Sequence, residues 1–130
     1  MSRNAITAEN AVAVGPYSHG IDAGDAIYLS RQTPIDPATG QLVSGGITVQ
    51  AEQCFANLFA VLKSAGLDEG SVVKVNVFLV DMSDFAAMNS VYEKQFTRPY
   101  PARTTIGVAS LPLGARIEIE LVARRENRTS

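Results

Sequence analysis

The segment ARIEIELVARR, residues 115–125, is the feature that most limits what this chain can fold into. Apolar and polar side chains alternate along it, which is typical of a β-strand with one face in a core. The segment VVKVNVFLVD, residues 72–81, alternates in the same way and predicts a second strand. Its positions expected on the buried face are Val73, Val75, Val77 and Leu79. Two such one-sided strands need a second layer to cover their apolar face.

Helical periodicity supplies that second layer. Residues 47–65 and 84–96 carry apolar side chains at three- and four-residue spacing, so we expect a helix in each segment. Further strands are predicted over residues 25–33 and 103–110, while the Pro- and Gly-rich segment 34–46 predicts turns. The apolar stripe expected on the second helix, interpreted as core packing, consists of Phe85, Met88, Val91 or Tyr92, and Phe96.

The predicted order of elements is strands, helix, strand, helix, strand, strand. We therefore expect residues 1–130 to form a single α+β domain, with two helices packed on one face of a mixed sheet. The opposite face would present Glu118 and Glu120 beside apolar groups such as Phe78 and Val80. A face of this mixed kind is either a plain solvent face or an oligomer interface, and its apolar content favours the interface.

Composition narrows the possible functions. The net charge is −2 and no basic patch is interleaved with aromatic residues, so a nucleic-acid partner is not expected. No apolar run approaches the roughly 18–20 residues of a membrane span, and the N-terminal segment lacks a signal-peptide pattern. We therefore expect a cytoplasmic protein without a membrane partner.

The sequence holds one histidine and one cysteine, His19 and Cys54, too few for a dedicated zinc site, and it has no Gly-rich phosphate loop. We expect neither a metal nor a cofactor. Cys54 is interpreted as a small core side chain, because it shares a helix face with apolar residues. For His19 we expect a surface or hydrogen-bonded structural role.

Arg103 stands directly after Pro-Ala in the segment RPYPARTTIGVASLP, at the start of a predicted strand. Pro99 and Pro101 fix the approach of the backbone and disfavour a helix before the strand. A planar, permanently charged guanidinium at such a rigid position is either a solvated strand-end charge or a holder of a carboxylate. Position alone favours the solvated charge, because surface ion pairs are common and weak.

Four segments resemble the signature blocks of one family, the RidA (YjgF-type) reactive-intermediate deaminases. They are GPYSHG, IYLSRQTPIDPATGQLVSGG, YPARTTIGVASLP and RIEIELVAR, and the resemblance spans residues 6–124. It implies a chorismate-mutase-like α+β fold and a homotrimer with clefts between subunits. It also implies the hydrolysis of 2-imino and 2-enamino acids, such as 2-iminobutanoate and 2-iminopropanoate, to 2-keto acids and ammonia.

The resemblance assigns roles residue by residue. Arg103 matches the arginine that grips the substrate carboxylate, a task suited to two parallel N–H donors and a permanent charge. Glu118 matches the acidic residue that helps to position the attacking water, either as a general base or by orientation alone. Tyr17 and Ser30 match hydroxyl-bearing residues that the neighbouring subunit contributes. Glu120 shares the face of Glu118 and is interpreted as part of an interface hydrogen-bond network.

Two positions depart from the family pattern. Arg31 replaces a glycine whose backbone N–H helps to bind the carboxylate, and its side chain either narrows the cleft, binds a second acidic group or points into solvent. We favour the inward, selectivity-tuning orientation. Thr105 stands where some relatives carry a cysteine, and it is expected to line the substrate site without loss of activity, because imine hydrolysis needs no thiol.

Other functions have been described for relatives of this type: RNA cleavage that inhibits translation, and holdase chaperoning. The only basic cluster here is Arg124, Arg125 and Arg128 near the C-terminus, which gives the RNA-cleaving alternative little support. A non-catalytic protein that binds small acids in the same clefts is a further alternative, made more plausible by Arg31.

Overall fold

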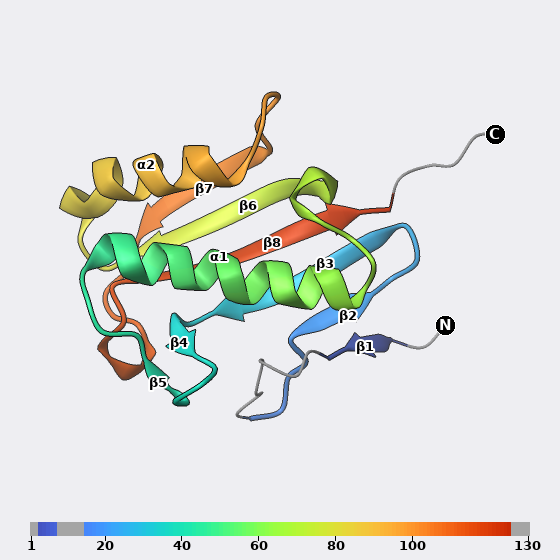
Figure 1. The fold of residues 1–130 in the computed structure, drawn as a ribbon, viewed down its shortest axis with the longest axis horizontal. Helices are drawn as coiled ribbons and strands as arrows, with labels where there is room; N and C mark the ends of the chain where they lie inside the picture. Colours follow the sequence, from blue (N-terminus) through green and yellow to red (C-terminus); the bar gives the residue numbers. More distant parts are fainter. Residues whose placement is uncertain (1–2, 8–14, 126–130) are drawn as a thin grey trace.

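One six-stranded sheet, with the strand order β1-β2-β3-β8-β6-β7, dominates the computed structural model, which describes residues 3–7 and 15–125. Both helices lie on one face of that sheet (Figure 1). The predicted α+β fold with a mixed sheet is thus confirmed. The strands are β1 (Asn4–Ile6), β2 (Gly20–Asp22), β3 (Ala26–Gln32), β6 (Val72–Leu79), β7 (Ala102–Gly107) and β8 (Ile117–Arg124). The helices are α1 (Ile47–Ser64) and α2 (Phe85–Gln95), and short 3₁₀ turns cover Glu69–Ser71, Met82–Asp84 and Pro112–Gly114.

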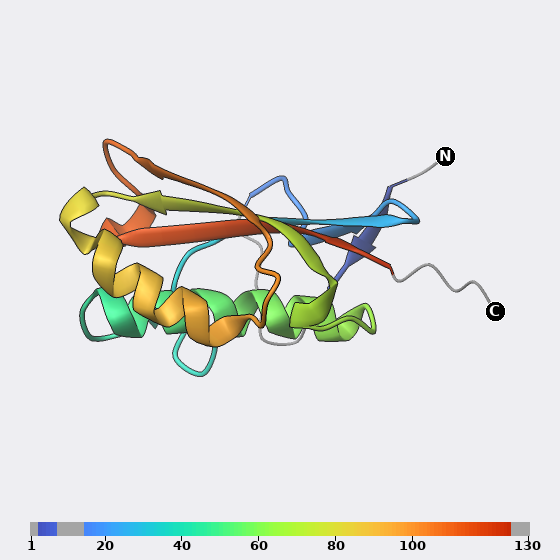
Figure 2. The ribbon, with the colours of Figure 1, turned by 90° about the horizontal axis from the view of Figure 1, so that it is seen from above.

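Strand pairing decides which face each side chain occupies. β8 is antiparallel to both β3 and β6, whereas β6 and β7 are parallel and are connected through α2. Val75 pairs with Leu121 on one side and with Arg103 on the other, so Arg103 lies on the helix-covered face. Phe78 pairs with Glu118, which places Glu118 on the opposite face. Figure 2 shows that this second face, called the outer face below, carries no helix.

The structure contains four short strands that the sequence did not reveal. β1 and β2 extend the sheet beyond β3, and each is three residues long, too short for alternation to be recognised. Within the turn-rich segment, β4 (Ile35–Asp36) and β5 (Gln41–Leu42) pair as a separate small hairpin. The prediction of turns alone in that segment is therefore incomplete.

Val73 is on the wrong face in the sequence prediction. It is 45% exposed, whereas Val72 is buried with 7% exposure. The pairing of β6 with β8 shifts register between Val72 and Lys74, and this irregularity moves one residue to the other side of the sheet. From Val75 onward the predicted alternation is confirmed.

An aromatic cluster joins the two helices. The ring of Phe55 on α1 lies 5.7 Å from Phe59, and 5.8 Å from both Tyr92 and Phe96. Phe55 is fully buried, and burial of such a side chain stabilises the fold by about 1.5–3 kcal/mol. This packing fixes α2 against α1, so the side chains that α2 directs towards β7, including Asn89, have a rigid support.

Cys54 and His19 both have the structural roles predicted for them. Cys54 is fully buried, and burial together with the charge of Glu118 raises the pKa of its thiol well above the usual value. His19 is buried, and its Nδ1 lies 2.9 Å from Nε2 of Gln32. No helix in the described part of the chain is long and apolar enough to cross a membrane.

Candidate functional site

Arg103 is held at the edge of the sheet by groups from α2. Its Nη1 donates a hydrogen bond of 2.7 Å to Oδ1 of Asn89. Its guanidinium carbon lies 4.7 Å from the centroid of the Tyr92 ring and 5.5 Å from that of Phe85. Phe85, Asn89 and Tyr92 recur at helical spacing, so one face of α2 meets the arginine. The aromatic rings and the amide orient the guanidinium without neutralising its charge.

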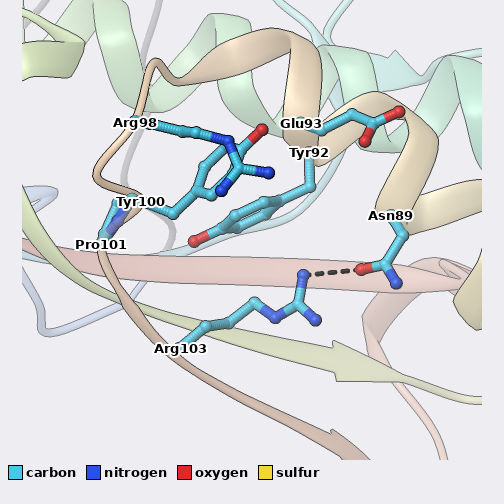
Figure 3. A pocket seen from close by; sticks show the side chains of 7 residues that line it. All are labelled: Asn89, Tyr92, Glu93, Arg98, Tyr100, Pro101 and Arg103. Carbon is cyan, nitrogen blue, oxygen red and sulfur yellow. Dashed lines mark hydrogen bonds between the residues drawn. The ribbon is translucent and has the colours of Figure 1, made fainter.

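Most of the donors of Arg103 remain available. A guanidinium has five N–H donors and no acceptor, and among the described residues only Asn89 accepts a hydrogen bond from it. A cavity of about 440 Å³ opens beside it, a size typical of small-molecule sites. Figure 3 shows the lining residues, which are Asn89, Tyr92, Glu93, Arg98, Tyr100, Pro101 and Arg103. We call this cavity the Arg103 pocket.

Tyr92 contributes a donor to the Arg103 pocket. It is only 5% exposed, and its hydroxyl has no hydrogen-bond partner among the described residues. Burial raises the pKa of this phenol, and the positive charge of Arg103 opposes part of the increase. The group therefore stays protonated at neutral pH and keeps an O–H to donate.

Glu118 belongs to a different cluster, on the outer face. Its Oε2 accepts a hydrogen bond of 2.5 Å from Oγ1 of Thr33, and its Oε1 lies 3.8 Å from Nη1 of Arg31. The guanidinium carbon of Arg31 lies over the ring of Phe78, 4.1 Å from the ring centroid. These neighbours leave Glu118 only 4% exposed.

Arg31 also approaches Glu120, with 3.9 Å between Nε and Oε1. Glu120 accepts a hydrogen bond of 3.0 Å from Asn76, so it is part of a polar network on the outer face. The predicted common face of Glu118 and Glu120 is confirmed by their positions on β8. The side chain of Arg31 rests along the sheet rather than extending freely into solvent, and it is not part of the lining of the Arg103 pocket in the same chain.

Ser30 and Tyr17 both contact the segment before β2, at Ser18 and His19 respectively. Ser30 lies within a register irregularity of β3, between Leu29 and Gln32, and its Oγ donates a hydrogen bond of 2.5 Å to the carbonyl of Ser18. Tyr17 is 46% exposed and packs edge-on against His19 at 5.8 Å between ring centroids. Both side chains lie where the loop before β2 meets β3.

Thr105 shares the helix-covered face with Arg103, two residues further along β7. Its hydroxyl is buried and has no hydrogen-bond partner among the described residues. The sheet therefore separates Arg103 and Thr105 from Glu118 and Arg31 within one chain.

Sequence reasoning did not identify Asn89, Tyr92 and Thr33 as contacts of the arginine and the carboxylate. Asn89 and Tyr92 could have been found, because they follow Phe85 by four and seven residues and therefore share its face of α2. Thr33 could not, because its contact with Glu118 joins residues 85 positions apart. In the described part of the chain no group of three or more His, Cys, Asp or Glu side chains could hold a metal ion.

The sequence and the fold of this chain are similar to those of known proteins. The family model described as endoribonuclease L-PSP matches residues 7–125. The RutC family protein y4sK of Sinorhizobium fredii is 51% identical over 110 residues, covering 85% of this chain and 87% of the relative. The 2-iminobutanoate/2-iminopropanoate deaminase of the goat, Capra hircus, is 46% identical over 117 residues, covering 90% and 85%.

The solved structures agree with the sequence comparison. RidA from an Antarctic Psychrobacter superimposes with a TM-score of 0.90 at 42% sequence identity, covering 95% of this chain and all of the other. The chain belongs to the RidA/YjgF family.

Proposed function

We propose that this protein hydrolyses 2-imino acids, and their 2-enamino tautomers, to 2-keto acids and ammonia. The observation that carries the proposal is Arg103, a fixed guanidinium with unused donors beside a cavity of about 440 Å³. That arrangement suits a small carboxylate. The deaminase name of relatives at about 46% identity supports the same reaction. Water adds its oxygen to the imine carbon, and the nitrogen leaves as ammonia, without any change of oxidation state.

In the proposed reaction Arg103 binds the substrate carboxylate and Glu118 positions the attacking water. An imine carbon next to a carboxylate is already electrophilic, so orientation and a placed water supply much of the acceleration. Tyr17, Ser30 and Thr105 would line the same site, with Arg31 on the Glu118 side.

The proposal requires a second copy of the chain. Because Arg103 and Glu118 lie on opposite faces, one site can contain both only if a neighbour presents its outer face to the Arg103 pocket. The outer face bears exposed apolar side chains, among them Tyr28 and Ile106, which suits a subunit interface. We propose the homotrimer that the family resemblance implies, with three shared clefts.

An amino-acid oxidase that generates imine in the presence of semicarbazide provides the test. The protein should divert imine from the trap and accelerate keto-acid release. Unchanged semicarbazone formation at micromolar protein would contradict the proposed activity. Light scattering should give a trimeric mass, and a monomeric mass would contradict the shared cleft.

RNA cleavage, suggested by the name of the family model, would rest on the basic cluster near the C-terminus, in which Arg124 is the described residue that is exposed and forms no ion pair with another described residue. Arg125 forms an ion pair with Asp22 and donates a hydrogen bond of 3.4 Å to the carbonyl of Ala65. Its charge is thus already engaged within the fold. Arg128 lies outside the described residues.

A further inference from the structure

The Arg103 pocket contains a second guanidinium. Arg98, in the loop between α2 and β7, lines the pocket together with Arg103. Its guanidinium carbon lies 5.3 Å from the centroid of the Tyr100 ring, which supports it by a cation–π contact. Among the described residues no carboxylate lies within ion-pairing distance of Arg98, although Glu93 lines the same pocket.

The space between the two arginines also contains the unpartnered Tyr92 hydroxyl. Figure 3 shows the Tyr92 side chain between those of Arg98 and Arg103. This hydroxyl is buried, protonated and without an acceptor in the described structure, so it suits a ligand oxygen. With two guanidinium groups and one carboxylate, the lining has a net positive charge.

We propose that Arg98 is a specificity-determining residue, and that the Arg103 pocket selects 2-imino dicarboxylic acids, whose second carboxylate it binds. The inference rests on the proposed function, because Arg103 is taken to hold the carboxylate next to the imine. Arg98 and the Tyr92 hydroxyl then bind the distal carboxylate. Glu93 opposes this binding through its like charge, and it limits the selectivity without removing it.

Binding of the keto-acid products tests the assignment without requiring turnover. Calorimetry would compare 2-oxoglutarate with 2-oxobutanoate for the intact protein and for Arg98→Gln, Glu93→Gln and Lys94→Gln. The intact protein should prefer 2-oxoglutarate by about tenfold, as expected for one charge-assisted contact. Arg98→Gln should abolish the preference and Glu93→Gln should increase it about threefold. Lys94→Gln removes a charge from the same helix outside the pocket lining, so it should retain the preference.

The imine assay then separates failure of the inference from failure of the proposed function. The assay would give kcat/KM for the glutamate-derived imine divided by kcat/KM for the alanine-derived imine. Arg98→Gln should lower this ratio about tenfold. Equal binding of the two keto acids, no binding of either, or a preference that survives Arg98→Gln would overturn the assignment of Arg98. If the binding preference depends on Arg98 while neither imine is hydrolysed, the dicarboxylate pocket stands and the proposed reaction fails.

Discussion

The Arg103 pocket and the cluster around Glu118 differ in how far their polar groups are satisfied. In the pocket, Arg103 has one hydrogen-bond acceptor and Tyr92 has none among the described residues, and a cavity lies beside both. On the outer face, Glu118 is buried against Thr33 and Arg31. The pocket has free donors for a ligand carboxylate and one carboxylate of its own, that of Glu93, whereas the outer face holds Glu118, the carboxylate that we propose positions the water. In the proposed reaction the two regions form one site only where a second copy of the chain presents its outer face to the pocket.

Replacement of Arg103 should have the largest effect, because it removes the group that we propose binds the substrate carboxylate. Two charge-assisted hydrogen bonds to a carboxylate are worth about 1.5–3 kcal/mol each. Arg103→Ala should therefore lower kcat/KM for imine hydrolysis by roughly 10²- to 10⁴-fold. Arg103→Lys keeps the charge but loses the planar fork, and most of the activity should go with it.

Lys63→Gln is the matched control for charge, since Lys63 is an exposed cation in the last turn of α1. It should leave turnover unchanged. Circular dichroism and light scattering would establish that the Arg103 variants keep the fold and the assembly. Near-normal turnover by a folded, assembled Arg103→Ala protein would contradict the carboxylate-binding role.

Mixing two inactive proteins tests whether the two halves come from different copies. The Arg103→Ala protein lacks the guanidinium that binds the substrate carboxylate, and the Glu118→Gln protein lacks the side-chain carboxylate that positions the water. Random mixing of the two in a trimer with shared clefts leaves about one quarter of the sites with both groups intact. The mixture, after dissociation and reassembly, should recover a corresponding share of activity. No recovery in verified mixed trimers would show that each chain uses its own Arg103 and Glu118.

The length of each element explains whether the sequence could predict it. Strand and helix periodicity located β3, β6, β8 and both helices, because each is long enough for its pattern to be counted. The three-residue strands β1 and β2 lack that length. The error at Val73 has a different cause, because a register shift depends on the neighbouring strand and leaves no mark in local alternation.

For the candidate site, the motifs predicted roles for Arg103 and Glu118 but not the residues that surround them. Alternation placed Glu118 correctly on the face away from the helices. It did not place Arg103 opposite to it, because β7 joins the sheet through a parallel pairing whose register only the folded structure reveals. The contact between Thr33 and Glu118 likewise depends on how the chain beyond β3 meets β8.

Thr33→Val should have a smaller effect, because it disturbs only the orientation of Glu118. It removes the hydroxyl that donates to Oε2 at 2.5 Å and preserves the shape of the side chain. A hydrogen bond to a charged group is worth about 1.5–3 kcal/mol, so we expect kcat to fall by roughly 10- to 150-fold. KM should change little, because the carboxylate is bound elsewhere. Thr33→Ser should restore most of kcat, and a failure of this rescue would show that packing, not the hydroxyl, matters.

Arg31→Gly should have the smallest effect and distinguishes two roles for the outer face. Arg31 contacts Phe78 and approaches both Glu118 and Glu120, with 44% of its side chain exposed. Ion pairs with this much exposure contribute about 0–1 kcal/mol, so turnover should change by no more than about fivefold. Because the side chain is part of the Glu118 cluster, the change should be equal for alanine-, leucine- and glutamate-derived imines. A gain confined to the leucine-derived imine would instead support the inward, selectivity-tuning role of Arg31. Substrate specificity would then depend on Arg31 at the outer face as well as on Arg98.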